Sequence, residues 1–297
     1  MSGTLTTLVR PSASARALGL LQATHPIPNM MFVAVVAVFS FLAASAAHRS
    51  VAPWDLARLL LGVFCAQAVI GAVNDYRDRE LDAASRPSKP IVRGLVTGKQ
   101  VLAVAAGCAA ATALLIAPFG LVTFALAVLI VALGLAYDLG LKGSPASGVL
   151  YALHFPLFPY VAWAVFGHWQ AFLPWLLPVG AALGVAMNIS NTLPDLEEDL
   201  AHGVRGLPHV LGMRRSLLAA WTLPLVLVAF VWALNLSGVL PSSRLEMLVA
   251  TGATVLSVAL AWGLHRARPQ PATLRVTFLV QAVGAVVFAS AWVAAVS

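Results

Sequence analysis

The chain has 297 residues, of which 60% are apolar and only 10% are charged. Soluble globular domains carry about one quarter charged residues, so this composition excludes an ordinary soluble protein and indicates one that is embedded in a membrane. The net charge of +7 does not indicate nucleic-acid binding, because the Lys and Arg residues lie in short loops between apolar runs and form no basic domain.

The first 22 residues form a mixed, polar segment that we expect to lie in the cytoplasm. This segment contains Arg10 and Arg16, and it lacks the compact apolar core and small-residue cleavage site of a signal peptide. The first apolar run is therefore expected to remain in the protein as a membrane span.

Nine apolar runs are long enough to cross a bilayer, whose core of about 30 Å requires about 20 mostly apolar residues per helix. The third and fourth runs are separated by only three residues, Pro118 to Gly120, which predicts a tight antiparallel hairpin. We predict an all-α, polytopic membrane protein that forms one domain over residues 1–297. The nine spans are expected near Pro28–Ala47, Trp54–Val73, Val101–Ala117, Leu121–Tyr137, Val149–Phe166, Phe172–Ile189, Ser216–Leu236, Leu245–Leu264 and Leu274–Val296.

The distribution of basic residues predicts the orientation of these spans. If the N-terminus is inside, 15 of the 18 Lys and Arg residues fall in inner segments and three in outer segments. Cytoplasmic loops are enriched in Lys and Arg, so we expect the N-terminus and the acidic segments to face the cytoplasm and the C-terminus to lie outside.

A first acidic row follows the second apolar run. Asn74, Asp78 and Asp82 are four residues apart and would lie on one face of a helix, with Asp75 one step round it. A solvated loop is the simple interpretation of such a stretch. Crowded carboxylates repel one another unless a positive charge lies between them, however, and the rest of the chain is poor in acidic residues. The row therefore indicates a metal site.

A second acidic row follows the sixth apolar run with the same spacing. Asn191, Asp195 and Asp199 each lie 117 residues after the matching member of the first row. This weak internal duplication predicts two acidic helix ends that face each other across a cavity. Pro194 lacks a backbone donor, so the helix is expected to kink or break just before Asp195.

Oxygen-only ligands in both rows favour Mg²⁺, which binds through a few carboxylates and completes its coordination with water and substrate phosphate. Basic residues near the rows suit a diphosphate, because Arg binds phosphate bidentately and Lys supplies a point charge. Positive-inside topology is the alternative explanation for each of them. The basic residues are Arg79, Arg86, Lys89 and Arg93 after the first row, and Lys142 after Tyr137 and Asp138.

The histidines and cysteines give weaker signals. His154 lies within the fifth span, and His202 and His209 follow the second row, but none is spaced as a metal ligand would be. We expect structural roles for these histidines. Cys65 and Cys108 both lie in apolar runs and are expected to be small buried side chains without redox chemistry.

Together these motifs resemble the UbiA superfamily of intramembrane prenyltransferases. The resemblance covers essentially the whole chain, because the family has nine spans with motifs after the second, fourth and sixth. It rests on Asn74-Asp75-x-x-Asp78-x-x-x-Asp82, on the following Arg86-Pro87-x-x-Pro90-Ile91, on Tyr137 to Lys142, and on Asp195-x-x-x-Asp199.

The resemblance implies helices around a central, lipid-accessible cavity, with two or more Mg²⁺ ions, an isoprenyl diphosphate donor and a lipophilic or aromatic acceptor. The metal ligands would be Asn74, Asp75, Asp78, Asp82, Asn191, Asp195 and Asp199, among which Asp78, Asp82, Asp195 and Asp199 would be catalytic. The donor would be bound by Arg79, Arg86, Arg93, Tyr137 and Lys142.

The acceptor is expected to be an aromatic compound or a quinone precursor. Two departures weigh against the hydroxybenzoate branch of the family: Gly203-Val-Arg-Gly-Leu-Pro replaces its Gly-x-x-Thr-Leu pattern, and the segment around His25 lacks an Arg for an acceptor carboxylate. A terpene cyclase would use the same metal site without an acceptor. A divalent cation transporter would instead place its carboxylates at the bilayer midplane. A CDP-alcohol phosphotransferase would need an Asp-Gly-x-x-Ala-Arg signature, which the sequence lacks.

Overall fold

The computed structural model describes residues 11–201 and 203–297, and every regular element in these two ranges is a helix. Nine of the helical segments in the described ranges are long and apolar enough to cross a membrane. This confirms the all-α, multi-pass fold. Predictions for residues 1–10 and for His202 lie outside the described residues.

Eight long helices form most of the bundle: α2 (Pro26–Ala46), α3 (Pro53–Ser85), α4 (Gly98–Ile116), α5 (Leu121–Asp138), α8 (Leu176–Thr192), α10 (Leu207–Leu236), α11 (Arg244–Ala267) and α12 (Pro271–Val296). Four shorter helices connect or extend them: α1 (Ala13–Ala23), α6 (Ser147–His154), α7 (Leu157–Phe166) and α9 (Leu196–Ala201). The 3₁₀ turns are η1 (Ala117–Phe119), η2 (Leu141–Gly143), η3 (Leu173–Trp175) and η4 (Leu193–Asp195).

Three elements differ from the predicted spans. The polar N-terminal segment contains helix α1, which was not predicted. Helix α3 continues past the predicted end of its span to Ser85, so the first acidic row lies on the last turns of the same helix. The fifth span is divided into α6 and α7 at Pro156, which has no backbone N–H to continue the helical hydrogen bonds.

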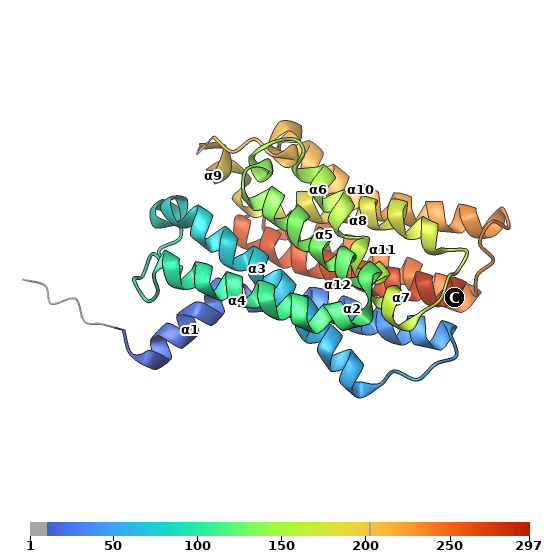
Figure 1. Ribbon diagram of the computed structural model, residues 1–297. Helices are drawn as coiled ribbons and strands as arrows, with labels where there is room; N and C mark the ends of the chain where they lie inside the picture. The colour runs from blue at the N-terminus through green and yellow to red at the C-terminus, as the bar shows by residue number, and fades with distance from the viewer. Residues whose placement is uncertain (1–10, 202) are drawn as a thin grey trace, which may run out of the picture.

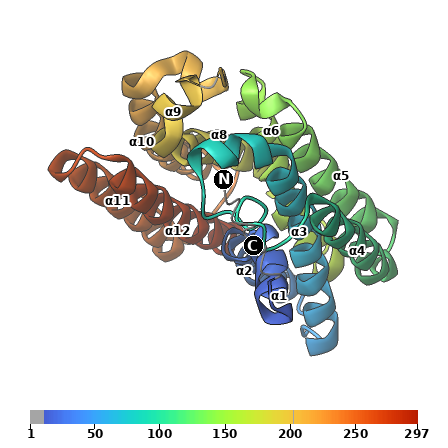
Figure 2. The same cartoon turned by 90° about the vertical axis from the view of Figure 1, so that its left-hand side faces the viewer.

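Most of the charged residues lie at one end of the bundle, which is called the charged end. Figure 1 shows α1, the α3–α4 connection and α9 at the end opposite to the C-terminus. Seen from the charged end, the long helices form a ring, and the end of α3 with its connection to α4 lies in front of the ring (Figure 2). Neighbouring helices pack as α3 on α4, α6 and α10 on α8, α2 on α7, and α11 on α12.

The largest apolar cluster fills the end of the bundle away from these charged connections. Its largest fully buried side chains are Phe39, Phe158, Phe172, Phe288 and Trp292. Their packing closes that end, whereas the charged end is lined by polar side chains. The two acidic rows therefore lie at the end of the bundle that this cluster does not close.

Close packing of α6 against α8 depends on Gly184. A Cβ atom at this position would lie 2.3 Å from the backbone carbonyl oxygen of Tyr151, a contact that only a backbone shift can relieve. We expect Gly184→Ala to lower the free energy of unfolding by about 1–3 kcal/mol, as overpacking does in protein cores. Gly107→Ala in α4 is the matched control, because no atom lies within 4 Å of its Cβ position. Thermal unfolding in detergent gives the melting temperatures of the two variants. Equal melting temperatures would contradict the prediction.

Candidate active site

The bundle encloses a cavity of about 560 Å³ that opens at the charged end. Its size is that of a ligand-binding site. The deep part is apolar and includes Phe39, Leu176, Val179, Ala289 and Trp292. The mouth is polar and is lined by His25, Asn74, Asp78, Arg86, Tyr137, Asp138, Lys142, Asn191, Asp195, Asp199 and His209. A polar mouth over an apolar interior suits a ligand with a charged head and a hydrocarbon tail.

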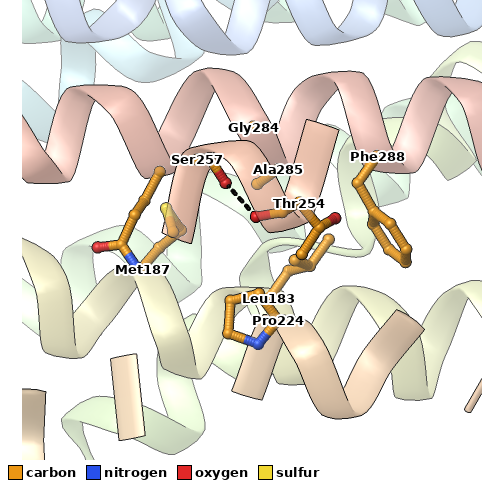
Figure 3. Close-up of a pocket in the computed structure, with 9 residues that line it drawn as sticks. Leu183, Met187, Pro224, Thr254, Ser257, Gly284, Ala285 and Phe288 are labelled. Atoms are coloured by element: carbon orange, nitrogen blue, oxygen red, sulfur yellow. Dashed lines mark hydrogen bonds between the residues drawn. The ribbon is translucent and has the colours of Figure 1, made fainter. Parts of the chain in front are cut away.

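A second pocket lies between α8, α10, α11 and α12, as Figure 3 shows. Its volume is about 10 Å³, which is room for a single water molecule. The hydroxyl of Ser257 at its wall donates a hydrogen bond to the carbonyl oxygen of Thr254 at 2.9 Å. This pocket is too small to be a substrate site.

The first acidic row is joined to the end of α5 and to η2. The amide nitrogen of Asn74 donates to Asp78 Oδ2 at 3.1 Å and to Asp138 Oδ1 at 3.0 Å. Lys142 Nζ lies 2.5 Å from both carboxylate oxygens of Asp78. Residues that are 64 positions apart therefore meet at the cavity mouth. The structure brings Asn74, Asp78 and Lys142 together, and their roles as metal and donor ligands stay predictions.

Two predicted ligands of the first row do not line the cavity. The buried Asp75 carboxylate lies 2.6 Å from His25 Nε2 and also pairs with Lys89. These contacts join the α3–α4 connection to the start of α2. Asp82 is also buried, 4.0 Å from the guanidinium of Arg86. Metal binding by Asp75 and Asp82 stays a prediction.

The second acidic row is divided among three elements. Asn191 lies in the last turn of α8, Asp195 in η4 and Asp199 in α9, and all three line the cavity. A 3₁₀ turn replaces regular α-helix at Pro194, where the sequence predicts a kink or break.

The carboxylate of Asp195 lies between two guanidinium groups. Arg86 donates to its Oδ2 at 2.8 Å and Arg275, near the start of α12, to its Oδ1 at 2.9 Å. On the next element, Asp199 Oδ2 lies 3.5 Å from His209 Nε2. Arg86 therefore links the end of α3 to the second acidic row across the mouth.

The other predicted donor-binding residues are divided between the mouth and the surface. Tyr137 lines the mouth and packs edge-on against Tyr151, with ring centroids 5.2 Å apart. Arg79 instead bonds to Glu80 and lies over the ring of Tyr76, and Arg93 is exposed. Neither of these two arginines lines the cavity.

Three residues in or beside the mouth were not predicted as site residues. Asp138 is buried and bonded to Asn74, His25 contacts Asp75, and Arg275 holds Asp195. The only sequence signal for Asp138 was its place beside Tyr137, as an isolated acid after an apolar run. His25 has left-handed backbone angles, with φ of 54°, which is uncommon for a residue other than Gly.

The oxygen ligands at the mouth fit a divalent cation that is shared with a phosphate group. Across residues 11–201 and 203–297, no three His, Cys, Asp or Glu side chains lie close enough together to hold a metal ion by themselves. Carboxylates and amides from α3 and from the α8–α9 region do face the same opening. This arrangement suits Mg²⁺, which takes one or two carboxylates and completes its shell with water and substrate phosphate.

Comparison with known proteins agrees with this geometry. The profile of the UbiA prenyltransferase family matches residues 31–283, which is most of the chain. The chain belongs to the UbiA prenyltransferase family. The family predicted from the motifs is thereby confirmed.

Curated relatives of this UbiA family member include enzymes with two different names. A digeranylgeranylglyceryl phosphate synthase from Natronomonas pharaonis is 34% identical over 61% of this chain and 66% of its own length. One from Methanopyrus kandleri is 29% identical over 72% of this chain and 80% of its own. A 4-hydroxybenzoate octaprenyltransferase from Polynucleobacter asymbioticus is 25% identical over 60% and 63%. The match to the first of these spans just under two thirds of that relative.

Solved structures show the same fold. A UbiA homolog from Archaeoglobus fulgidus, solved with GPP and Mg²⁺, has a TM-score of 0.70 at 18% identity over 92% of this chain and 99% of that one. A structure described for digeranylgeranylglyceryl phosphate synthase has a TM-score of 0.70 at 15% identity, covering 95% and 98%. At these identities the likeness shows that this chain has the UbiA fold.

Proposed function

We propose that this protein transfers the prenyl group of an isoprenyl diphosphate to a lipophilic acceptor within the membrane, with Mg²⁺ as its cofactor. One observation carries the proposal: two sets of oxygen ligands and the cations Arg86 and Lys142 surround the mouth of a cavity whose deeper part is mainly apolar. Such a site matches the charged head and hydrocarbon tail of the donor. The solved homolog with GPP and Mg²⁺ supports the same choice of donor and metal.

The chain's own residues would bind the donor by its diphosphate. Arg86 and Lys142 both line the mouth, where they can donate charge-assisted hydrogen bonds to phosphate oxygens. Bound Mg²⁺, held by the acidic rows, would supply further neutralisation of the negative charge on the leaving group. Stabilising this developing charge lowers the barrier to breaking the allylic C–O bond.

Beyond the mouth, the cavity wall excludes water from the electron-poor prenyl group. Phe32, Tyr151 and Phe155 line this part, and aromatic faces attract positive charge. Ile27 of α2 and Leu279 of α12 line the same cavity, and 79% and 51% of their surfaces are exposed. An acceptor dissolved in the bilayer can therefore reach the cavity along these two helices.

Two classes of acceptor are considered for the prenyl group. An aromatic or quinone-precursor acceptor is our first choice, and the relatives named for digeranylgeranylglyceryl phosphate make a glycerol-based lipid the second. Mass spectrometry of products, after purified protein is supplied with isoprenyl diphosphates and both acceptor classes, decides between them. A cyclised hydrocarbon formed without acceptor would show a terpene cyclase, and no turnover of any donor would refute the proposal.

A cation transporter is not supported by the arrangement of charge. The two acidic rows lie at the ends of α3 and α8 and in η4 and α9, at one end of the bundle. A transporter would need carboxylates near the midplane, where the cavity is lined mainly by apolar and aromatic side chains. The geometry therefore favours the enzyme.

We further propose that the cavity mouth faces the cytoplasm, as the distribution of Lys and Arg predicts. Ser88 lies in the exposed α3–α4 connection, and Ser237 is exposed at the opposite end, just after α10. A cysteine at Ser237 (Ser237→Cys) is expected to react with an impermeant thiol reagent in intact cells. Ser88→Cys should react only after the cells are opened. The reverse pattern would contradict the proposed orientation.

A further inference from the structure

We propose that Asp138 is a ligand of the divalent cation, together with Asn74 and Asp78. The part of the metal site that contains the first acidic row would then be built from two helices, α3 and α5. This inference rests on the proposed function, because it extends the cofactor site of that reaction. It adds a carboxylate from the end of α5 to the acidic row of α3.

The geometry joins the three side chains into one unit. Asn74 donates to Asp78 and Asp138 through the same amide nitrogen, at 3.1 and 3.0 Å, so the two carboxylates lie on either side of it. All three side chains line the cavity. Two carboxylates and one amide are a suitable protein share of a Mg²⁺ site, in which water and phosphate supply the remaining ligands.

The second observation is an unpaired oxygen. Asp138 is only 6% exposed, and its Oδ2 is buried with no hydrogen-bond partner in the described ranges. A buried carboxylate oxygen without a partner is costly, because it has lost its hydration and gained nothing in return. A group that supplies positive charge to this oxygen would offset that cost.

The cations nearby are already engaged with other carboxylates. Lys142 is bonded to both oxygens of Asp78, Arg86 to Asp195, and Lys89 to Asp75. No hydrogen bond or ion pair of the described residues joins a Lys or Arg to Asp138. A metal ion that takes the place of the Lys142 ammonium beside Asp78 would supply positive charge to Asp138 as well.

Mn²⁺ binding to the purified protein in detergent, followed by electron paramagnetic resonance without substrate, tests this inference. Asp138→Asn keeps an oxygen for Asn74 to donate to but removes the charge, so we expect the Mn²⁺ dissociation constant to rise by about tenfold or more. Glu80→Gln is the control, because Glu80 is 85% exposed on α3 at the same end of the bundle. Its Mn²⁺ affinity should not change.

A second readout separates metal binding from a structural role. In excess chelator, Asp138→Asn removes a poorly compensated buried charge and should melt at the same temperature as the unmodified protein or higher. A structural carboxylate would instead lower the melting temperature in this condition. Should Asp138→Asn not fold, Asp138→Ser retains an acceptor for Asn74 and allows the same measurement.

The outcomes distinguish this inference from the proposed function. Unchanged Mn²⁺ affinity in Asp138→Asn, with prenyl transfer by the unmodified protein, would overturn the ligand assignment and leave the function standing. Weakened Mn²⁺ binding without prenyl transfer from any donor would support the ligand and refute the function.

Discussion

Asp78→Asn is expected to lower the turnover of prenyl transfer by about 10²- to 10³-fold, the effect of removing one preorganised electrostatic group from an active site. Asp78 lines the mouth and lies within bonding distance of Asn74 and Lys142, so the loss of its charge changes both the metal ligands and the position of Lys142. Asn has almost the same size, and the protein should still fold. Steady-state kinetics with purified enzyme and excess Mg²⁺ measure the effect.

The same loss is expected for Asp195→Asn, because one acidic row alone cannot hold cations on both sides of the leaving group. Glu197→Gln is the control for this variant, since Glu197 is exposed on α9 and does not line the cavity. Full activity in Asp78→Asn or Asp195→Asn, or undiminished activity in excess chelator, would refute the metal-dependent mechanism.

Lys142→Gln is expected to raise the donor's KM or to lower kcat by about tenfold or more. The loss of a charge-assisted contact costs about 1.5–3 kcal/mol, and each tenfold change corresponds to about 1.4 kcal/mol. Lys142 lies at the mouth against both oxygens of Asp78, where a diphosphate oxygen can compete for its ammonium group.

Lys99→Gln is the matched control for Lys142→Gln. Lys99 is exposed near the start of α4, which lies at the same end of the bundle, and it does not line the cavity. Both variants are measured in detergent, where the orientation of the protein in a membrane no longer matters. Kinetic constants that are equal in the two variants would show that Lys142 contributes only to the orientation of the protein in the membrane.

The sequence predicted the fold well because membrane spans depend on local composition. A run of about 20 apolar residues favours a helix in the bilayer, since a helix satisfies its backbone hydrogen bonds within the segment itself. The break at Pro194 was predictable for the same reason: it depends on one residue and its immediate neighbours. The row of Asn74, Asp78 and Asp82 on one helix face also followed from spacing alone.

Contacts between distant residues could not be read from spacing. His25 meets Asp75 across 50 positions, and Arg275 meets Asp195 across 80, so neither pair leaves a local pattern. In the sequence, Arg275 stands out only as one of the 15 basic residues of the predicted inner segments. The pairing of Asp75 with His25 and Lys89 likewise distinguishes it from its neighbour Asn74, which faces the cavity.

The polar mouth lies at one end of the cavity, and this has a consequence for the energetics of the proposed reaction. Free diphosphate would leave through the mouth into water, whereas the prenylated product, being apolar, would remain in lipid. The two products of each turnover would thus be separated into different phases. Reversal requires both to return to the same site, so enzymatic hydrolysis of diphosphate in the compartment facing the mouth would make the transfer irreversible.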